Sequence, residues 1–251
     1  MPSARFPWRR KPVSERPAPL YLIAGGPGSV RRKGPDPLVQ EALARTGVSR
    51  PRVAYVGAAS GDNPAFRLLI GRMLEKAGAG RVKLAPLCGA RGSLQKAEAV
   101  LEESDIIFMS GGDVEEGMRV LRAKGAGPVL RRLWRKGKPL FGVSAGSIML
   151  ARRWVRWADP DNDASAELLP CLGFAPVLCD THGEEDGWGE LRTLLSLCPA
   201  GATGYGIVSG SAIKIEEDGS VSALGGEVHV FRRRKSSVAQ IGSLLPRAAE
   251  H

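Results

Sequence analysis

The segment Pro139-Leu-Phe-Gly-Val-Ser-Ala-Gly146 decides the fold and contains the strongest functional motif of the chain. Its first five residues form a short apolar run, which predicts a buried strand. Gly142–Gly146 then matches Gly-x-Ser-x-Gly, a sharp turn from a strand into a helix that presents the serine above a sheet. Small residues suit such a turn because larger side chains would collide with neighbouring backbone. Ser144 is therefore the candidate nucleophile; the alternative is an ordinary strand-to-helix turn.

Predicted strands and helices alternate on both sides of this motif. Short apolar runs predict strands, and apolar residues at helical spacing predict the helices between them. The expected strands before the motif are Leu20–Ala24, Val53–Val56, Val82–Ala85 and Asp105–Met109, with helices at 64–77, 94–101, 114–121 and 129–134. Strands that are apolar throughout predict an α/β fold with a mostly parallel central sheet and helices on both faces. Near the C-terminus, short strands at 212–215, 221–224 and 228–231 predict an antiparallel edge on the same sheet.

The net charge of +10 is concentrated at the two ends of the 251 residues. Residues 1–19 contain five basic residues and one acidic residue, and residues 231–251 have the same count. We therefore expect a basic, proline-rich disordered arm over 1–19, one α/β domain over 20–231 and a basic tail over 232–251. With the charge outside the domain, nucleic-acid binding is expected only weakly and only through these ends.

The sequence also contains indications of the cellular compartment. No uncharged apolar run approaches the roughly 20 residues of a membrane-spanning helix, and Met1–Leu20 lacks the apolar centre of a secretory signal. The cysteines are widely spaced and form no Cys-x-x-Cys pair, which predicts free thiols: Cys88, Cys171, Cys179 and Cys198. A cytoplasmic protein without a membrane partner is expected.

A nucleophilic serine needs a base, and the chain has three histidines. His251 is terminal and His229 alternates within a predicted strand, so His182 is the best base. A lone histidine is, however, more often a surface or core residue. For the acid that orients the imidazole, the candidates are Asp159, Asp180 and the acidic loop Glu184–Asp186.

The turn Ser110-Gly-Gly-Asp113 ends the strand expected beside the Ser144 strand. It can bring the N–H of Gly112 towards the serine, and Ala145 at the start of the next helix can supply a second donor. Asp113 also suits the N-cap of the following helix, and both uses are compatible. Asp159–Asp163 resembles the start of a calcium loop but lacks the required glycine and glutamate, so no metal is expected.

Four stretches together resemble the dipeptidase E and cyanophycinase family of serine peptidases, over about residues 20–230. They are Val-Ala-Tyr-Val-Gly-Ala-Ala-Ser (53–60), Phe-Met-Ser-Gly-Gly-Asp (108–113), Gly-Val-Ser-Ala-Gly-Ser (142–147) and Asp-Thr-His (180–182). The resemblance implies a class I glutamine amidotransferase-like fold, a flavodoxin-like three-layer sandwich. It also implies a serine hydrolase that cleaves small peptides or amide bonds through an acyl-enzyme without a cofactor. Ser144 is then the nucleophile, His182 the base, and Gly112 and Ala145 the oxyanion donors.

The departures from this family concern the acid and the substrate. Relatives resembling dipeptidase E have an aspartate about 15 residues after the serine, which makes Asp159 the expected third member. Those resembling cyanophycinase use a glutamate in Gly-Ile-Asp-Glu, but Gly206–Ser209 has no acid here. Where the family carries arginines after the histidine, this chain has the acidic loop. Amine-bearing substrates are therefore expected, with Asp113, Glu184 and Glu185 as substrate contacts.

Two other interpretations stay open at this point. A non-catalytic protein that binds small ligands on the same scaffold is the main alternative. A glutaminase is weaker because related amidotransferases have cysteine at the position of Ser144. Homodimerisation is also open.

Overall fold

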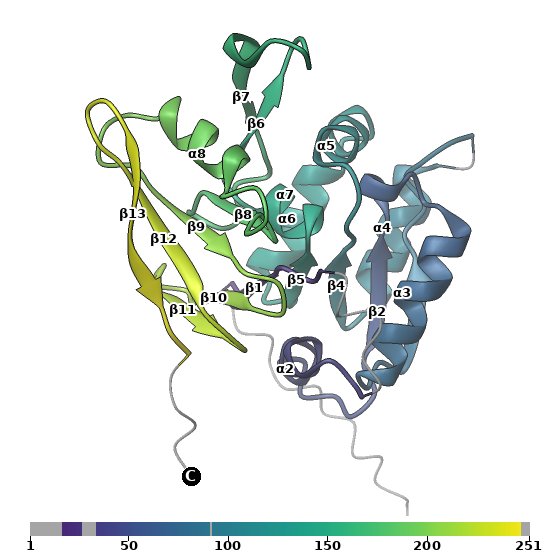
Figure 1. Cartoon of the computed structure of the whole chain (residues 1–251). Coiled ribbons are helices and arrows are strands. Elements are labelled where there is room, and N and C mark those ends of the chain that lie inside the picture. The colour runs from purple at the N-terminus through teal and green to yellow at the C-terminus, as the bar shows by residue number, and fades with distance from the viewer. Residues whose placement is uncertain (1–16, 27–33, 91, 247–251) are drawn as a thin grey trace, which may run out of the picture.

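The computed structural model describes residues 17–26, 34–90 and 92–246, and within them the main sheet has seven strands (Figure 1). Five of them are parallel and lie in the order β1-β5-β4-β2-β3, and two antiparallel strands extend the sheet beside β1 as β11-β10. The bounds are β1 (Leu20–Ile23), β2 (Arg52–Val56), β3 (Arg81–Leu84), β4 (Ile106–Met109), β5 (Leu140–Val143), β10 (Ala212–Ile215) and β11 (Val221–Leu224). The predicted parallel sheet with antiparallel strands near the C-terminus is confirmed.

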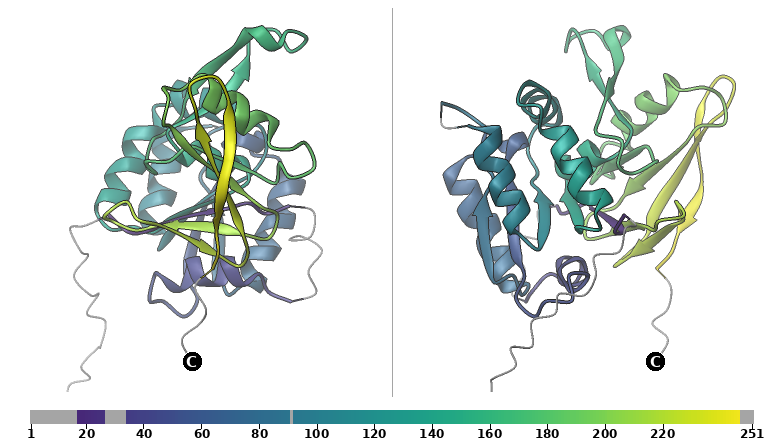
Figure 2. Two further views of the ribbon diagram at one scale, coloured as in Figure 1. Left: turned by 60° about the vertical axis from the view of Figure 1, so that its left-hand side comes forward. Right: turned by 180° about the vertical axis from the view of Figure 1, so that it is seen from behind.

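Helices cover both faces of this sheet (Figures 1 and 2). One face packs against α2 (Pro37–Ala44) and α3 (Pro64–Lys76). The other packs against α4 (Leu94–Glu103), α5 (Val114–Ala123), α6 (Ala126–Arg135) and α7 (Ala145–Leu150). Because side chains alternate along a strand, β1 contributes Leu20 and Leu22 to the second core and Tyr21 and Ile23 to the first.

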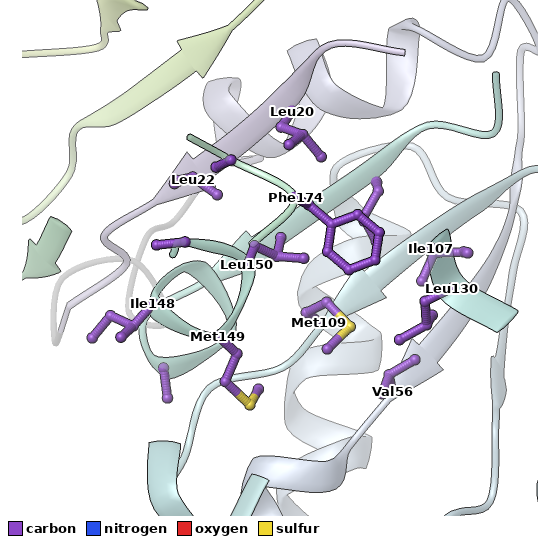
Figure 3. Packing of buried hydrophobic residues seen from close by; sticks show 14 of the residues in the cluster. Leu20, Leu22, Val56, Ile107, Met109, Leu130, Ile148, Met149, Leu150 and Phe174 are labelled. Carbon is purple, nitrogen blue, oxygen red and sulfur yellow. The ribbon is translucent and has the colours of Figure 1, made fainter. Parts of the chain in front are cut away.

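The core on the α7 side supports the turn that carries Ser144. Figure 3 shows Ile148, Met149 and Leu150 of α7 packed with Leu22 of β1 and Met109 of β4. Each of these side chains is at most 5% exposed. The turn between β5 and α7 therefore sits on a densely buried base and is fixed relative to the sheet.

The C-terminal part forms a second sheet in the order β13-β12-β9-β8. Its strands are β8 (Cys179–Thr181), β9 (Thr203–Ile207), β12 (Val228–Arg233) and β13 (Val238–Leu244), and α8 (Gly189–Ser196) packs on it. The strand at 228–231 was expected on the edge of the main sheet and instead belongs here. The reason is a separate apolar cluster, in which Phe231 and Trp188 pack against Leu191 and Leu195 of α8.

This second sheet also corrects the expected tail over residues 232–251. β12 continues to Arg233, and β13 pairs with it along its whole length, from Val228↔Leu244 to Arg233↔Val238. Residues 247–251 lie outside the described residues, as do residues 1–16 of the expected N-terminal arm. Part of the C-terminal basic charge therefore belongs to a sheet.

A two-stranded hairpin, β6 (Arg153–Trp157) and β7 (Ala166–Pro170), projects beyond the two sheets in every view (Figures 1 and 2). Its connection includes the short helix η2 (Asp163–Ser165), and a similar turn, η1 (Ala58–Ser60), follows β2. Within the described ranges, no helix has the length and apolar character needed to cross a membrane.

Candidate active site

Ser144 lies between β5 and α7 in a strained backbone conformation. Its φ and ψ are 55° and −126°, a region that residues with a side chain rarely adopt. The Ser144 N–H and the Ser147 hydroxyl both donate to the carbonyl of Ile23 in β1, each at 2.9 Å. The strained serine is therefore tied to the neighbouring strand by two hydrogen bonds.

The glycines of this elbow (Gly142–Gly146) allow close backbone contacts. A Cβ on Gly146 would lie 2.1 Å from the carbonyl oxygen of Met109, and one on Gly142 would lie 2.5 Å from the backbone of Gly146. Distances this short are prohibitive for any side chain. The two glycines of Gly-x-Ser-x-Gly are thus required by the packing of α7 on β4 and β5.

His182 meets Ser144 from the second sheet. It follows β8, and its Nε2 lies 2.8 Å from the Oγ of Ser144. Its N–H donates to Ile207 of β9, which continues the strand pairing by one residue before the chain turns at φ 45°. Ser144 and His182 are two of the four non-glycine residues with positive φ in the described part of the chain. Such strain clusters at functional sites, and here it falls on a hydrogen-bonded pair.

The turn after β4 lies directly against the serine. A Cβ on Gly111 would be 3.2 Å from the Cβ of Ser144, and Gly112 has φ 139°, with no room for a Cβ beside the carbonyl of Ala59. Within the described ranges, the N–H groups of Gly112 and Ala145 donate no hydrogen bond. Free amides next to the serine are what an oxyanion would need, so these two residues remain the predicted donors.

Asp113 caps α5, as the sequence predicted. Its Oδ1 accepts a hydrogen bond of 2.7 Å from the N–H of Glu116. The side chain is exposed and close in sequence to Gly112. One carboxylate oxygen is thus committed to the helix, and a contact with substrate stays a prediction.

Asp159, the expected third member, lies in the exposed connection of the β6–β7 hairpin. Its Oδ1 accepts from the N–H of Asp161, and its backbone exchanges hydrogen bonds with Ser165. In the part of the chain that the structure describes, no hydrogen bond or ion pair joins Asp159 to His182. The spacing of 15 residues between Ser144 and Asp159 does not reveal that β6 lies between them and leads the chain into an exposed hairpin connection. Of the three expected members, the structure brings together Ser144 and His182.

The acidic loop after the histidine is partly tied down. Oε1 of Glu184 accepts a 2.9 Å hydrogen bond from the N–H of Ser209, and Oδ1 of Asp186 accepts from Trp188. Burial alone would raise the pKa of Glu184, but the hydrogen bonds from Ser209 and the charge of His182 outweigh it and lower that pKa. Glu185 is exposed. Ser209 was missed from the sequence because its contact with Glu184 spans 25 residues.

Two further carboxyls, Asp180 and Glu190, interact electrostatically with Asp186 of the loop. Asp180 is 5% exposed, and burial, reinforced by the charge of Glu190, raises its pKa to about 7. Glu190 accepts a hydrogen bond from the indole N–H of Trp154, and its pKa is raised by burial. No local signal in the sequence marks Glu190, because only the fold brings the start of α8 back towards β8. The charge of His182 acts on Glu190 and lowers its pKa, against the larger effect of burial.

His229 is elsewhere in the second sheet, where its ring lies edge-on against Trp188 with 5.6 Å between centroids. Its place in a strand is as predicted. Among the described residues, no group of three or more histidine, cysteine or acidic side chains is arranged to hold a metal ion. The four cysteines are free thiols.

Comparison with known proteins gives matches of three kinds. The family model of peptidase family S51 matches residues 21–222. Pyridoxal 5'-phosphate synthase subunit PdxT of Geobacillus sp. (strain WCH70) is 36% identical over 73 residues, or 29% of this chain and 38% of PdxT. Uncharacterized peptidase YgaJ of Bacillus subtilis (strain 168) is 28% identical over 121 residues, or 46% of this chain and 49% of YgaJ. The chain thus spans less than half the length of these relatives.

Two solved structures share the fold. A peptidase from an acI-B1 Actinobacterium has a TM-score of 0.66 at 14% identity, with 92% of this chain and 98% of that chain covered. A putative peptidase E protein from Listeria monocytogenes EGD-e has a TM-score of 0.60 at 18% identity, with 83% and 98% covered. At these identities the similarity shows the fold.

Proposed function

Because this chain belongs to peptidase family S51, we propose that it is a serine hydrolase that cleaves small peptides or amide bonds through an acyl-enzyme. The observation that carries the proposal is the 2.8 Å hydrogen bond between Ser144 Oγ and His182 Nε2. It lies at the carboxyl ends of the parallel strands, where open α/β sheets bind their ligands. Nucleophile and base are therefore within proton-transfer distance in a suitable place.

The reaction follows from this pair. His182 Nε2 takes the hydroxyl proton while Ser144 Oγ forms a bond to the carbonyl carbon of the substrate. The N–H groups of Gly112 and Ala145 bind the resulting oxyanion. As the C–N bond breaks, the imidazolium gives its proton to the leaving amine, and the acyl group stays on Ser144. A water molecule, activated by the same imidazole, then hydrolyses the ester and restores the free serine.

For the substrate, we propose a small peptide or amide with an amine-bearing group. The supporting feature is the acidic character of the loop after His182, in which Glu185 is exposed. Of the residues expected to contact substrate, Glu185 has no hydrogen bond or ion pair within the described ranges, while Asp113 and Glu184 each have one oxygen engaged. A cationic substrate group would find favourable charge here. Lysyl and arginyl peptides should therefore be cleaved faster than aspartyl dipeptides.

The test is covalent labelling with a fluorophosphonate probe, which reacts with activated serines. The wild-type protein should be labelled, and Ser144→Ala should abolish labelling. Ser196→Ala is the matched control because Ser196 is an exposed serine on α8, away from the elbow. An unlabelled but folded wild-type protein would refute the hydrolase and favour a small-ligand-binding protein. Faster cleavage of aspartyl dipeptides would refute the substrate preference alone.

A further inference from the structure

The acidic loop contains a buried carboxylate oxygen that has no hydrogen-bond partner within the described residues. Among the described residues, two buried carboxylate oxygens lack a hydrogen-bond partner, Oδ1 of Asp62 and Oε2 of Glu184. The second belongs to a residue two positions after His182. A buried acceptor without a donor costs free energy, about 1–3 kcal/mol and more when charged. Because it lies two residues after the histidine in the chain, this oxygen is a candidate acceptor for a donor that moves in during function.

The position of this carboxylate is fixed by loops from three parts of the chain. Oε1 is held by the N–H of Ser209 in the connection from β9 to β10. Ser209 in turn packs against Gly26, where a Cβ would lie 2.9 Å from the serine Oγ. Gly25 packs against Val143, the residue before Ser144. Glu184 is thus anchored to the segments that surround the elbow, with one oxygen left over.

The ring of His182 has a matching free group. Its Nε2 is engaged by Ser144, and within the described ranges its Nδ1 has no hydrogen-bond partner. The charge of His182 contributes to the lowered pKa of Glu184, which keeps that carboxylate ionised at neutral pH. When Nε2 takes the serine proton, Nδ1–H becomes part of an imidazolium and a stronger donor.

The other carboxyls of this region, like Glu184, each have one oxygen engaged in a hydrogen bond. Asp180 is buried in β8 and accepts the N–H of Thr181, and Asp186 accepts the N–H groups of Trp188 and Gly189. Glu190 is engaged by Trp154. Of the acids in this loop, at Asp180 and on α8, Glu184 is the one with a buried carboxylate oxygen that has no partner within the described residues.

Within the described residues, no hydrogen bond or ion pair joins Glu184 to His182 in the resting structure. We propose that Glu184 is the positioning residue for His182, and that its Oε2 and Nδ1–H come together in a hydrogen bond as the imidazole takes the proton from Ser144. This proposal rests on the proposed function, and it assigns to Glu184 the role that the family resemblance suggested for Asp159. In that role the carboxylate sets the tautomer and orientation of the ring and stabilises the imidazolium. Contact between substrate and the acidic loop then falls to Glu185.

The experiment compares Glu184→Gln with Glu190→Gln. In Glu184→Gln the amide keeps the side-chain volume and an acceptor for the N–H of Ser209, so folding should be preserved; thermal unfolding checks this. The rate constant of fluorophosphonate labelling is measured from pH 5 to 9. Glu184→Gln should lower the plateau by about 10-fold or more. It should also move the midpoint of the acid limb to lower pH, because an imidazolium without its carboxylate loses its proton more readily.

The control variant distinguishes a direct contact with His182 from the general electrostatic effect of a nearby carboxylate. Glu190→Gln removes a carboxylate that also acts electrostatically on His182 but is held by Trp154, and its plateau should stay within about twofold of wild type. Glu184→Asp, which restores the charge, should restore the wild-type midpoint. Equal profiles for wild type and Glu184→Gln, or equal losses in the two glutamine variants, would overturn the proposal.

A second readout does not depend on activity. Ring ¹⁵N chemical shifts distinguish the two imidazole tautomers, and only three histidines need assignment. Neutral His182 should carry its proton on Nδ1 in the wild type and lose that preference in Glu184→Gln. A tautomer unaffected by the substitution would overturn the positioning role even if the protein labels normally. An unlabelled wild type with the expected tautomer change would instead refute the hydrolase.

Discussion

Ser144 and His182 are joined by a 2.8 Å hydrogen bond, and each holds a backbone φ, 55° and 45°, that residues with side chains rarely adopt. Such a conformation costs about 1–3 kcal/mol, so two of them occur together only where the surrounding structure compensates. At Ser144 the compensation comes from the carbonyl of Ile23, which accepts from both the serine N–H and Ser147.

The strain at Ser144 can be measured with two inactive variants. Ser144→Ala and Ser144→Gly both remove the hydroxyl, but only alanine keeps a Cβ at φ 55°. Ser144→Gly should therefore be more stable than Ser144→Ala by about 1 kcal/mol in urea unfolding. Equal stabilities, or a more stable alanine variant, would show that the elbow is unstrained.

Gly111→Ala should slow the reaction while the chain still folds. The new Cβ would lie 3.2 Å from the Cβ of Ser144, close enough to shift the serine by a few tenths of an ångström. Fluorophosphonate labelling should fall about 10-fold or more, since catalysis is sensitive to small displacements. Gly71→Ala on α3 is the control, because its Cβ meets no atom within 4 Å. If Gly111→Ala labels as fast as that control, the turn after β4 does not bear on the serine.

Asp159→Asn should leave labelling within about twofold of the wild type, because the side chain is exposed and its hydrogen bonds stay within the hairpin. The measurement is the labelling rate at neutral pH beside that of Glu184→Gln. A large loss in Asp159→Asn and none in Glu184→Gln would return the aspartate to the site.

Asp180 should make the folded state less stable as pH rises. Its pKa is 3.8 in an unfolded chain and about 7 in the fold, so between these values the native state holds a proton that the unfolded state releases. The free energy of unfolding therefore falls from about pH 4 to pH 7 and then levels off, by a few kcal/mol at most. Asp180→Asn should flatten this decline and exceed the wild type in stability at pH 8. Urea unfolding at pH 5 and 8 checks both, and identical slopes would contradict the assignment.

Removal of β13 should destabilise the protein. A chain that ends at residue 237 loses the pairing with β12 and the contact of Val238 with the Trp188 and Phe231 cluster. Its urea midpoint should be lower than that of a chain ending at Pro246, which keeps β13. Labelling should also fall, since the same sheet carries β8 and His182. Equal midpoints would mean that residues 238–246 are dispensable, as expected of a tail.

The five parallel strands could be predicted from the sequence because most are short apolar runs that pack on both faces, as in Ile106–Met109. The contact between Ser144 and His182 could be predicted too, since a glycine-bounded serine and a scarcity of histidines are local signals. The second sheet was not predicted because β8 has three residues and β13 contains Gln240 and Gly242 in a weak alternation. In this sheet, which strands pair with one another is determined by contacts between residues far apart in the chain.

A carboxylate partner for His182 could not be predicted from the sequence in the same way. The spacing found in similar proteins suggested Asp159, but the direction of β6 depends on how the hairpin packs, which no local pattern records. The anchoring of Glu184 depends on Ser209, an ordinary loop residue until β9 is placed beside β8.

The place of β1 in the main sheet has a consequence for synthesis on the ribosome. Leu20 pairs with Leu140 on one side and Ile215 on the other, so this apolar strand is made before both of its neighbours and is enclosed only after β10 has followed. Its Ile23 carbonyl holds the elbow. The Ser144 elbow therefore cannot form before β5 has been synthesised, and β1 keeps one unpaired edge until β10 follows it from the ribosome.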